Sequence, residues 1–312
     1  METEASHINT KIIALGNQKG GVGKTTNCVQ IATALGEMGR KCLIWDLDMN
    51  FGTTRHFGIA AGAYWGTFEL LTGQDEIDNV IVTEHDEDVD LPSNVHLITA
   101  DRNLEGLDKA LGAEHKFFPA GILLEPLKQL RGRYDYIFLD TAPSAATTTL
   151  AAYMAADFFV LSTTPQTFAI KGLEDAVADI KAAIRQGNKK LLVLGVILSD
   201  VDKRLRLARL HMDLVEELFR QQPGQPSAKF ETIISRSTVI GEAQKLGKTI
   251  FQTHPDHKVT DQYRTLAQEI EARLEAFNQA RNVTPIVESK VETQKVEAQE
   301  EHASNVEVRT NG

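Results

Sequence analysis

The chain has 312 residues, of which 42% are hydrophobic and 24% are charged, and its formal net charge is −10. This composition is typical of a folded globular protein and excludes a disordered or fibrous chain. The two cysteines, Cys28 and Cys42, are too few for a disulfide framework, and no apolar run reaches the ~18 residues that a membrane span needs. We therefore expect a cytoplasmic protein in which any nucleic-acid contact comes from a local basic patch.

Short apolar runs alternate with helical patterns along the chain, beginning with residues 11–17 and 41–48 on either side of a helix expected at 25–38. Continuous apolar runs are typical of strands that are buried on both faces of a parallel sheet. The sequence therefore predicts an α/β fold with a doubly wound, mostly parallel sheet that is flanked by helices. Further strands of this kind are expected at residues 95–99, 136–140, 158–162 and 191–198.

A glycine-rich loop, KGGVGKTT from Lys19 to Thr26, lies between the first expected strand and the first expected helix. In such a loop the backbone N–H groups surround a phosphate, the helix N-terminus adds partial positive charge, and a lysine reaches the terminal phosphates. The strict phosphate-loop pattern has a glycine where this chain has Gln18, and the additional Lys19 precedes the glycines. We expect the nucleotide to be bound by Gly20, Gly21, Val22, Gly23, Lys24, Thr25 and Thr26.

This loop resembles that of the ParA/MinD family of deviant Walker A ATPases, whose hallmark is the same KGGVGKTT run. The resemblance extends over roughly residues 10–275. It implies a P-loop NTPase fold, ATP and Mg²⁺ as ligands, and ATP hydrolysis that is slow until a partner protein stimulates it. It also implies that Lys24 contacts the phosphates of the ATP bound by its own chain, whereas Lys19 reaches across a dimer interface to the nucleotide of a second copy.

Asp140 ends the apolar run YIFLD, where the chain is similar to the family's metal-binding segment. In an open α/β sheet, ligands bind at the carboxyl ends of the strands. Phosphoanhydride hydrolysis needs a metal that gathers charge on the transferred phosphoryl group. We therefore expect Asp140 and the hydroxyl of Thr25 to hold Mg²⁺.

A pair of aspartates, Asp46 and Asp48, follows the second expected strand. By resemblance, Asp48 orients the attacking water and Asp46 supports the site. The family typically continues with Pro-Gln-Gly-Asn, whereas this chain has Met49 and Asn50 at the first two positions, which leaves the rate of hydrolysis open. The expected catalytic residues are Lys19, Lys24 and Asp48.

The strand expected at 191–198 runs into Ser199 and Asp200, at the place where family members contact the adenine base; which residues read the base stays open. A basic cluster in a helical pattern follows. Its apolar stripe is expected to be Leu207, Leu210, Leu214 and Leu218, and Arg206 and Arg209 lie about 60° apart beside it. We expect nonspecific contacts with DNA phosphates from Lys203, Arg206, Arg209 and Arg236.

The resemblance implies a partitioning ATPase: ATP drives homodimerisation and nonspecific DNA binding, and hydrolysis stimulated by a ParB-like partner releases the DNA. Such a protein segregates a chromosome, a plasmid or another cargo, in the cytoplasm and at the nucleoid. The alternative is a MinD-like or adaptor ATPase that positions a protein complex without binding DNA. A membrane partner is not expected, because residues 283–312 contain six Glu but only two Lys and one Arg. A metabolic synthetase would need an additional substrate-binding segment, to which no part of the sequence points.

Three parts are expected along the chain: an N-terminal extension at 1–9, a ParA-like ATPase domain at 10–281, and a disordered acidic tail at 282–312. The helix before the tail carries Tyr263, Leu266 and Ile270 at spacings of three and four, which predicts one apolar face against the core.

Overall fold

The computed structural model of the protein describes residues 9–112, 119–165, 169–218 and 228–283. The tail expected to be disordered lies almost entirely outside these residues. The chain divides into one unit that ends at Ile270 and a second that begins at Glu271, so that the boundary falls within the last helix. Within the described residues, no helix has the length and apolar character needed to cross a membrane.

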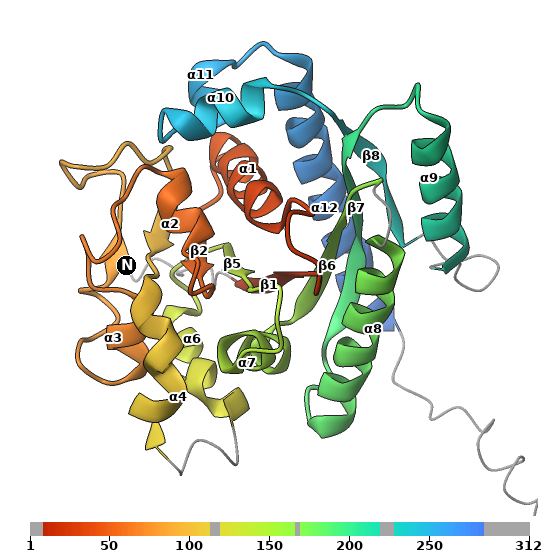
Figure 1. Cartoon of the computed structure of the whole chain (residues 1–312). Helices are drawn as coiled ribbons and strands as arrows, with labels where there is room; N and C mark the ends of the chain where they lie inside the picture. Colours follow the sequence, from red (N-terminus) through yellow and green to blue (C-terminus); the bar gives the residue numbers. More distant parts are fainter. Residues whose placement is uncertain (1–8, 113–118, 166–168, 219–227, 284–312) are drawn as a thin grey trace, which may run out of the picture. The chain divides into compact units, whose positions relative to one another are not determined.

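An eight-stranded sheet forms the centre of the first unit, in the order β3-β4-β2-β5-β1-β6-β7-β8 (Figure 1). Neighbouring strands are parallel, except that β3 pairs antiparallel with β4. The predicted doubly wound, mostly parallel sheet is therefore confirmed. The strands are β1 (Lys11–Gly16), β2 (Cys42–Asp46), β3 (Ile81–Val82), β4 (Val95–Ile98), β5 (Tyr136–Asp140), β6 (Phe158–Thr163), β7 (Leu192–Val201) and β8 (Lys229–Ser235).

Helices cover both faces of this sheet (Figure 1). On one face lie α1, α10, α11 and the part of α12 that belongs to the first unit, and on the other lie α6, α7 and α8. The helices are α1 (Lys24–Glu37), α2 (Gly52–His56), α3 (Thr67–Leu71), η1 (Arg102–Gly106), α4 (Leu107–Ala110), η2 (Pro119–Leu123), α6 (Leu124–Leu130), α7 (Thr147–Ala155), α8 (Ala169–Gln186), α9 (Arg206–Leu218), α10 (Val239–Lys245), α11 (Ile250–Thr253) and α12 (Lys258–Val283).

The apolar runs of the sequence form the central strands because helices bury them on both sides. Every residue of β2, β5 and β6 is buried. The apolar face expected on the last helix is also confirmed, since Tyr263, Leu266 and Ile270 are at most 1% exposed. Two strands were not predicted: β3 has only two residues, and β8 is an edge strand that is partly exposed and therefore lacks a continuous apolar run.

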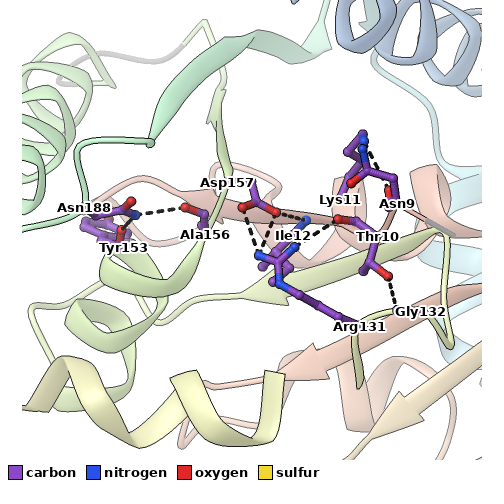
Figure 2. A network of polar contacts seen from close by, with 10 residues as sticks. All are labelled: Asn9, Thr10, Lys11, Ile12, Arg131, Gly132, Tyr153, Ala156, Asp157 and Asn188. Carbon is purple, nitrogen blue, oxygen red and sulfur yellow. Dashed lines mark hydrogen bonds and ion pairs between the residues drawn. The ribbon is translucent and has the colours of Figure 1, made fainter. Parts of the chain in front are cut away.

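Hydrogen bonds around Asp157 tie the amino ends of the central strands together (Figure 2). Asp157 Oδ2 accepts a 3.1 Å bond from the backbone N–H of Ile12, and Arg131 Nη2 donates to both carboxylate oxygens at 3.0 and 3.2 Å. Arg131 also donates to the backbone oxygen of Thr10. This edge lies opposite the glycine-rich loop, so it offers a test of stability that does not touch the candidate site.

We expect Asp157→Ala to destabilise the fold by about 1–3 kcal/mol, because the N–H of Ile12 loses its acceptor in a partly buried position. Arg131→Ala should cost only about 0–1 kcal/mol, since the Arg131 side chain is 43% exposed. Urea denaturation of the two variants checks this order. Equal losses would show that the ion pair, rather than the backbone bond, is what matters at Asp157.

Candidate functional site

The glycine-rich loop leaves β1 at the carboxyl edge of the sheet and enters α1 at Lys24. Gly21 and Gly23 have φ values of 73° and 85°, a left-handed conformation that favours glycine. The side chain of Lys24 is 6% exposed, and its Nζ donates to the backbone oxygens of Asn17 at 3.1 Å and Lys19 at 3.3 Å. Burial lowers the pKa of Lys24, while the Asp140 and Asp48 carboxylates act in the opposite direction. The lysine is therefore held over the loop and close to two carboxylates.

Asp140 lies at the end of β5 and connects this loop to α2. Its Oδ2 accepts hydrogen bonds from the hydroxyls of Thr25 at 2.8 Å and Thr53 at 2.7 Å. Burial raises the pKa of Asp140, although the two threonine bonds and the charge of Lys24 lower it. Its Oδ1 is buried without a hydrogen-bond partner among the described residues. Hydroxyl and carboxylate oxygens are ligands that Mg²⁺ prefers, so Thr25 and Asp140 fit a magnesium ion.

Asp46 lies directly beside Asp140, because the two residues are register partners on β2 and β5. Its Oδ2 accepts bonds from the backbone N–H and the hydroxyl of Thr54, at 2.9 and 2.8 Å. Burial, and next the charge of Asp140, raise the pKa of Asp46. Asp46 therefore braces the start of α2 from inside the protein.

Asp48 is only partly buried, in contrast to Asp46 and Asp140. Its Oδ1 accepts bonds from the backbone and side-chain N–H groups of Asn50, both at 2.9 Å. The next residue, Phe51, has a positive φ of 44°, and the guanidinium of Arg55 lies 5.2 Å from its ring centre. Asn50 thus holds one oxygen of Asp48 in place.

A cavity of about 230 Å³ extends from the glycine-rich loop along the sheet edge. Its lining residues belong to the glycine-rich loop, to α1, β7, β8, α10 and α12, and to the segments that follow β6 and β8. Beneath it, Asn27 on α1 bonds to Ser162, Ser199 and Tyr263, and so connects four elements. The described residues that line the cavity are Gly21, Gly23, Thr26, Asn27, Thr164, Ser199, Asp200, Ile234, Ser235, Ser237, Ile240, Gly241 and Tyr263.

The structure therefore gathers most of the predicted site at one edge: Lys24, Thr25, Asp48 and Asp140 lie within electrostatic reach of one another. Lys19 lies in the same loop, half-buried, and its charge contributes after burial to the lowered pKa of His211 on α9. Gly20 and Gly21 are exposed, whereas Val22 is buried and Thr26 is half-buried.

The predicted DNA contacts are all exposed side chains. Lys203, Arg206 and Arg209 are exposed, on α9 or just before it. Arg236 is exposed as well, but its guanidinium bonds Asp200 through Nε and Nη2, each at 3.0 Å. Arg204 is held in the same way by Asp202.

The apolar stripe expected on α9 is wrong at two of its four positions, since Leu210 and Leu214 are 49% and 47% exposed, while Ala208, His211 and Val215 are buried. The side chains of Leu207 and Leu218 lie outside the described residues. The small side chain of Ala208 allows a close approach, and His211 Nε2 lies 3.4 Å from the hydroxyl of Thr163 at the end of β6. The helix therefore packs with the face that carries Ala208, His211 and Val215, although this face has less apolar surface than the face with the leucines.

Two sets of residues at this edge were missed. Thr53 donates to Asp140 and Thr54 donates to Asp46, the two buried carboxylates. The sequence signal that could have identified them is the pair of threonine hydroxyls a few residues after Asp48. The second set lies in the cavity wall from Ile234 to Gly241, a stretch in which the sequence analysis singled out only Arg236, as a DNA contact and not as part of this site.

A family model described as an AAA domain matches residues 10–193. The chain is 32% identical to the chromosome-partitioning ATPase Soj of Thermus thermophilus, over 84% of this chain and 96% of that protein. It is 30% identical to the sporulation initiation inhibitor protein Soj of Bacillus subtilis, over 84% of this chain and 98% of that protein.

A solved structure of cobyrinic acid a,c-diamide synthase from Mycobacterium smegmatis, with bound ADP and magnesium, is also similar. It matches with a TM-score of 0.67 and 25% identity, and the match covers 83% of this chain and 93% of that chain. The same fold therefore occurs in proteins with different outputs.

Proposed function

The chain belongs to the ParA/MinD family of P-loop ATPases, and from this premise we propose that it is a partitioning ATPase of the ParA type. Binding of Mg-ATP drives face-to-face dimerisation and nonspecific DNA binding, and hydrolysis stimulated by a ParB-like or other partner releases the DNA. The cycle segregates or positions DNA or another cargo at the nucleoid. The ATPase domain of this proposal spans residues 10–281, and 282–312 form an acidic tail.

The observation that carries the proposal is the convergence of Lys24, Thr25, Asp48 and Asp140 beside the cavity. Bound magnesium supplies charge neutralisation at the terminal phosphates. Thr25 and Asp140 would hold that ion, and the loop N–H groups and Lys24 would hold the phosphates. The ADP and magnesium in the similar synthase structure support the same ligands here.

Roles for the two remaining catalytic candidates follow from their exposure. Asp48 is partly exposed with one oxygen fixed by Asn50, so its other oxygen is oriented to accept a proton or a hydrogen bond from water. Lys19 would act across the dimer on the nucleotide of the second copy. Dimerisation would then complete each site, so that ATP hydrolysis would occur only in the dimer.

The DNA surface of this proposal consists of Lys203, Arg206 and Arg209, with Arg236 as a fourth candidate. Exposed basic side chains without neighbouring aromatic groups favour contacts to backbone phosphates over base readout. The pairing of Arg236 with Asp200 neutralises part of its charge, so the α9 residues should dominate.

A second candidate function is supported by the leucines of the same region. Leu205, Leu210 and Leu214 are each about half exposed beside the basic residues. Exposed apolar side chains favour a protein partner more than a phosphate backbone. This observation supports an adaptor ATPase that positions a protein complex without binding DNA.

Sedimentation separates these functions. The protein is mixed with DNA or with anionic liposomes, each with ATP, ADP or no nucleotide. DNA binding that needs ATP supports partitioning, while ATP-dependent self-association without DNA binding supports the adaptor. Liposome binding would contradict both, and rapid ATP turnover that depends on a small-molecule substrate would instead favour a metabolic enzyme.

The double variant Arg206→Glu, Arg209→Glu should weaken DNA binding at every sequence tested and lower the slope of log affinity against log salt by about 2. Lys189→Glu, Lys190→Glu is a matched control, because it reverses two exposed charges that precede β7, at the opposite edge of the sheet. Fluorescence anisotropy with labelled duplexes measures both. An unchanged salt slope in the α9 variant would remove this surface from the DNA-binding model.

A further inference from the structure

One residue before the glycine-rich loop departs from the strict phosphate-loop pattern and has no role in the proposed function. The strict pattern has a glycine at position 18, and this chain has Gln18. The Nε2 of Gln18 donates a 2.6 Å hydrogen bond to Oδ2 of Asp179 on α8. Both side chains are half-buried, so the bond is partly shielded from water. The departure from the pattern therefore ties the start of the loop to a helix.

The preceding residue, Asn17, fixes the backbone of Lys19. Asn17 is 1% exposed. Its Oδ1 accepts a 2.9 Å bond from the backbone N–H of Lys19, and its Nδ2 donates to the backbone oxygen of Ser162 at 2.8 Å. Because both ends of the buried amide are used, it cannot rotate without leaving a polar group unpaired. The backbone oxygen of Lys19 also accepts a bond from Lys24 at 3.3 Å, so Lys19 is held at both of its backbone groups.

Helix α8 approaches this support closely at Gly172. A Cβ added at Gly172 would lie 2.4 Å from Oδ1 of Asn17 and 3.1 Å from Cβ of Lys19. The first distance is far shorter than a van der Waals contact, and Asn17 cannot move aside without giving up its bond to Lys19. Glycine is therefore required at this position, although it is unfavourable inside a helix. Asp179 lies about two turns farther along α8, so both contacts come from one face of the helix.

We infer that α8 positions Lys19 for its action on the nucleotide of the second copy, and that the bond between Gln18 and Asp179 is the anchor. The inference rests on the proposed function, because it concerns how Lys19 is held for that action. A charge that acts across an interface must have a fixed position when the second copy arrives, and a small misplacement costs a large factor in rate. Gln18, Asn17 and Asp179 act through Lys19 and are positioning residues.

The test exchanges donor and acceptor between Gln18 and Asp179 without changing the size of either side chain. Gln18→Glu sets two carboxylates against each other and should break the bond. Asp179→Asn keeps an oxygen that can accept from Gln18, so it should behave as the wild type. In the double variant Gln18→Glu, Asp179→Asn the amide lies on α8 and the carboxylate lies beside the loop. The bond can then form in the opposite direction.

Gln18→Glu should lower kcat for ATP hydrolysis by about 10-fold or more and reduce ATP-dependent dimerisation, while the affinity for Mg-ATP by calorimetry stays near the wild-type value. The double variant should recover most of the loss. In a Lys19→Gln background, the further change Gln18→Glu should have no effect on single-turnover hydrolysis, because both changes act through one group. A merely structural role would instead lower stability and nucleotide affinity together, and its effect would add to that of Lys19→Gln.

Two further variants on α8 provide an independent measurement and its control. Gly172→Ala should lower kcat by displacing Asn17, although alanine favours a helix more than glycine does. Asp179→Ala should also lower kcat, because Gln18 loses its acceptor. Asp175→Ala is the matched control, since it removes another half-buried carboxylate one turn earlier on the same helix, and it should keep the wild-type kcat. Urea denaturation shows whether each variant is folded.

The outcomes separate the inference from the proposed function. Normal dimerisation and kcat in Gln18→Glu, with both lost in Lys19→Gln, would overturn the inference and leave the proposed function standing. A loss in Gln18→Glu that the double variant does not restore, or that adds to the loss in Lys19→Gln, would do the same. If Lys19→Gln itself dimerises and hydrolyses ATP as the wild type does, the two-copy site is wrong and the inference falls with it.

Discussion

Lys19→Gln should abolish ATP-dependent dimerisation and DNA binding while the chain still binds ATP. The reason is that the two lysines of the loop have different proposed roles. Lys24 is buried and bonded to two backbone oxygens over the loop, so it can serve only the nucleotide of its own chain. Lys19 is half-buried beside α9, and its proposed partner is the phosphate group held by a second copy. A charge supplied in trans at the transition state is worth about 10³-fold or more in rate.

The measurements are nucleotide affinity by calorimetry, dimer fraction by analytical ultracentrifugation, and steady-state ATP hydrolysis. Lys24→Gln should lose nucleotide binding itself, in contrast to Lys19→Gln. Lys41→Gln makes the same change at an exposed lysine beside the amino end of β2 and should behave as the wild type. If Lys19→Gln still dimerises with ATP, the two-copy site is wrong even if Mg-ATP binding is right.

The parts of the candidate site that the sequence could predict are those built from consecutive residues. The loop from Lys19 to Thr26 and the strand that ends at Asp140 carry their own signals, because a phosphate loop needs glycines and a buried parallel strand needs a continuous apolar run. Parallel strands bring their carboxyl ends to one edge, so the juxtaposition of Asp46 and Asp140 also followed from the fold.

The parts that were missed depend on packing between distant segments. The cavity wall from β8 to α10 lies beside the loop, which is some 200 residues earlier in the chain. Because β8 is partly exposed, it has no continuous apolar run by which the sequence could have predicted it as a strand. The α9 error has a similar origin. Helical periodicity predicts that the leucines form the buried face, because leucine is more apolar than alanine or histidine. In the structure Ala208 and His211 are buried instead, and Leu210 and Leu214 face outward. Which face packs is decided by the shape of the partner, which a single sequence does not contain.

The second large effect is expected at Asp48. Asp48→Asn should lower kcat for ATP hydrolysis by about 10²-fold or more, because it removes the group that orients and deprotonates water. Nucleotide affinity should stay near the wild-type value, since the side-chain hydrogen bonds of Asp48 come from Asn50 and it reaches Lys24 through its charge alone. The dimer should therefore accumulate with ATP, and DNA binding should persist for longer than in the wild-type chain.

Asp46→Asn is the matched control, with the same chemical change two residues away. Burial raises the pKa of Asp46, so loss of its charge costs little, and an amide oxygen can keep both bonds from Thr54. The amide nitrogen cannot accept the 3.2 Å bond that the backbone N–H of Asp48 donates to Asp46 Oδ1, so only this one bond is lost. The kcat of Asp46→Asn should therefore fall much less than that of Asp48→Asn. Single-turnover hydrolysis and calorimetry on both variants decide between the aspartates. A large loss of kcat in Asp46→Asn with normal turnover in Asp48→Asn would reverse their roles, and the buried carboxylate would then be the group that acts on water.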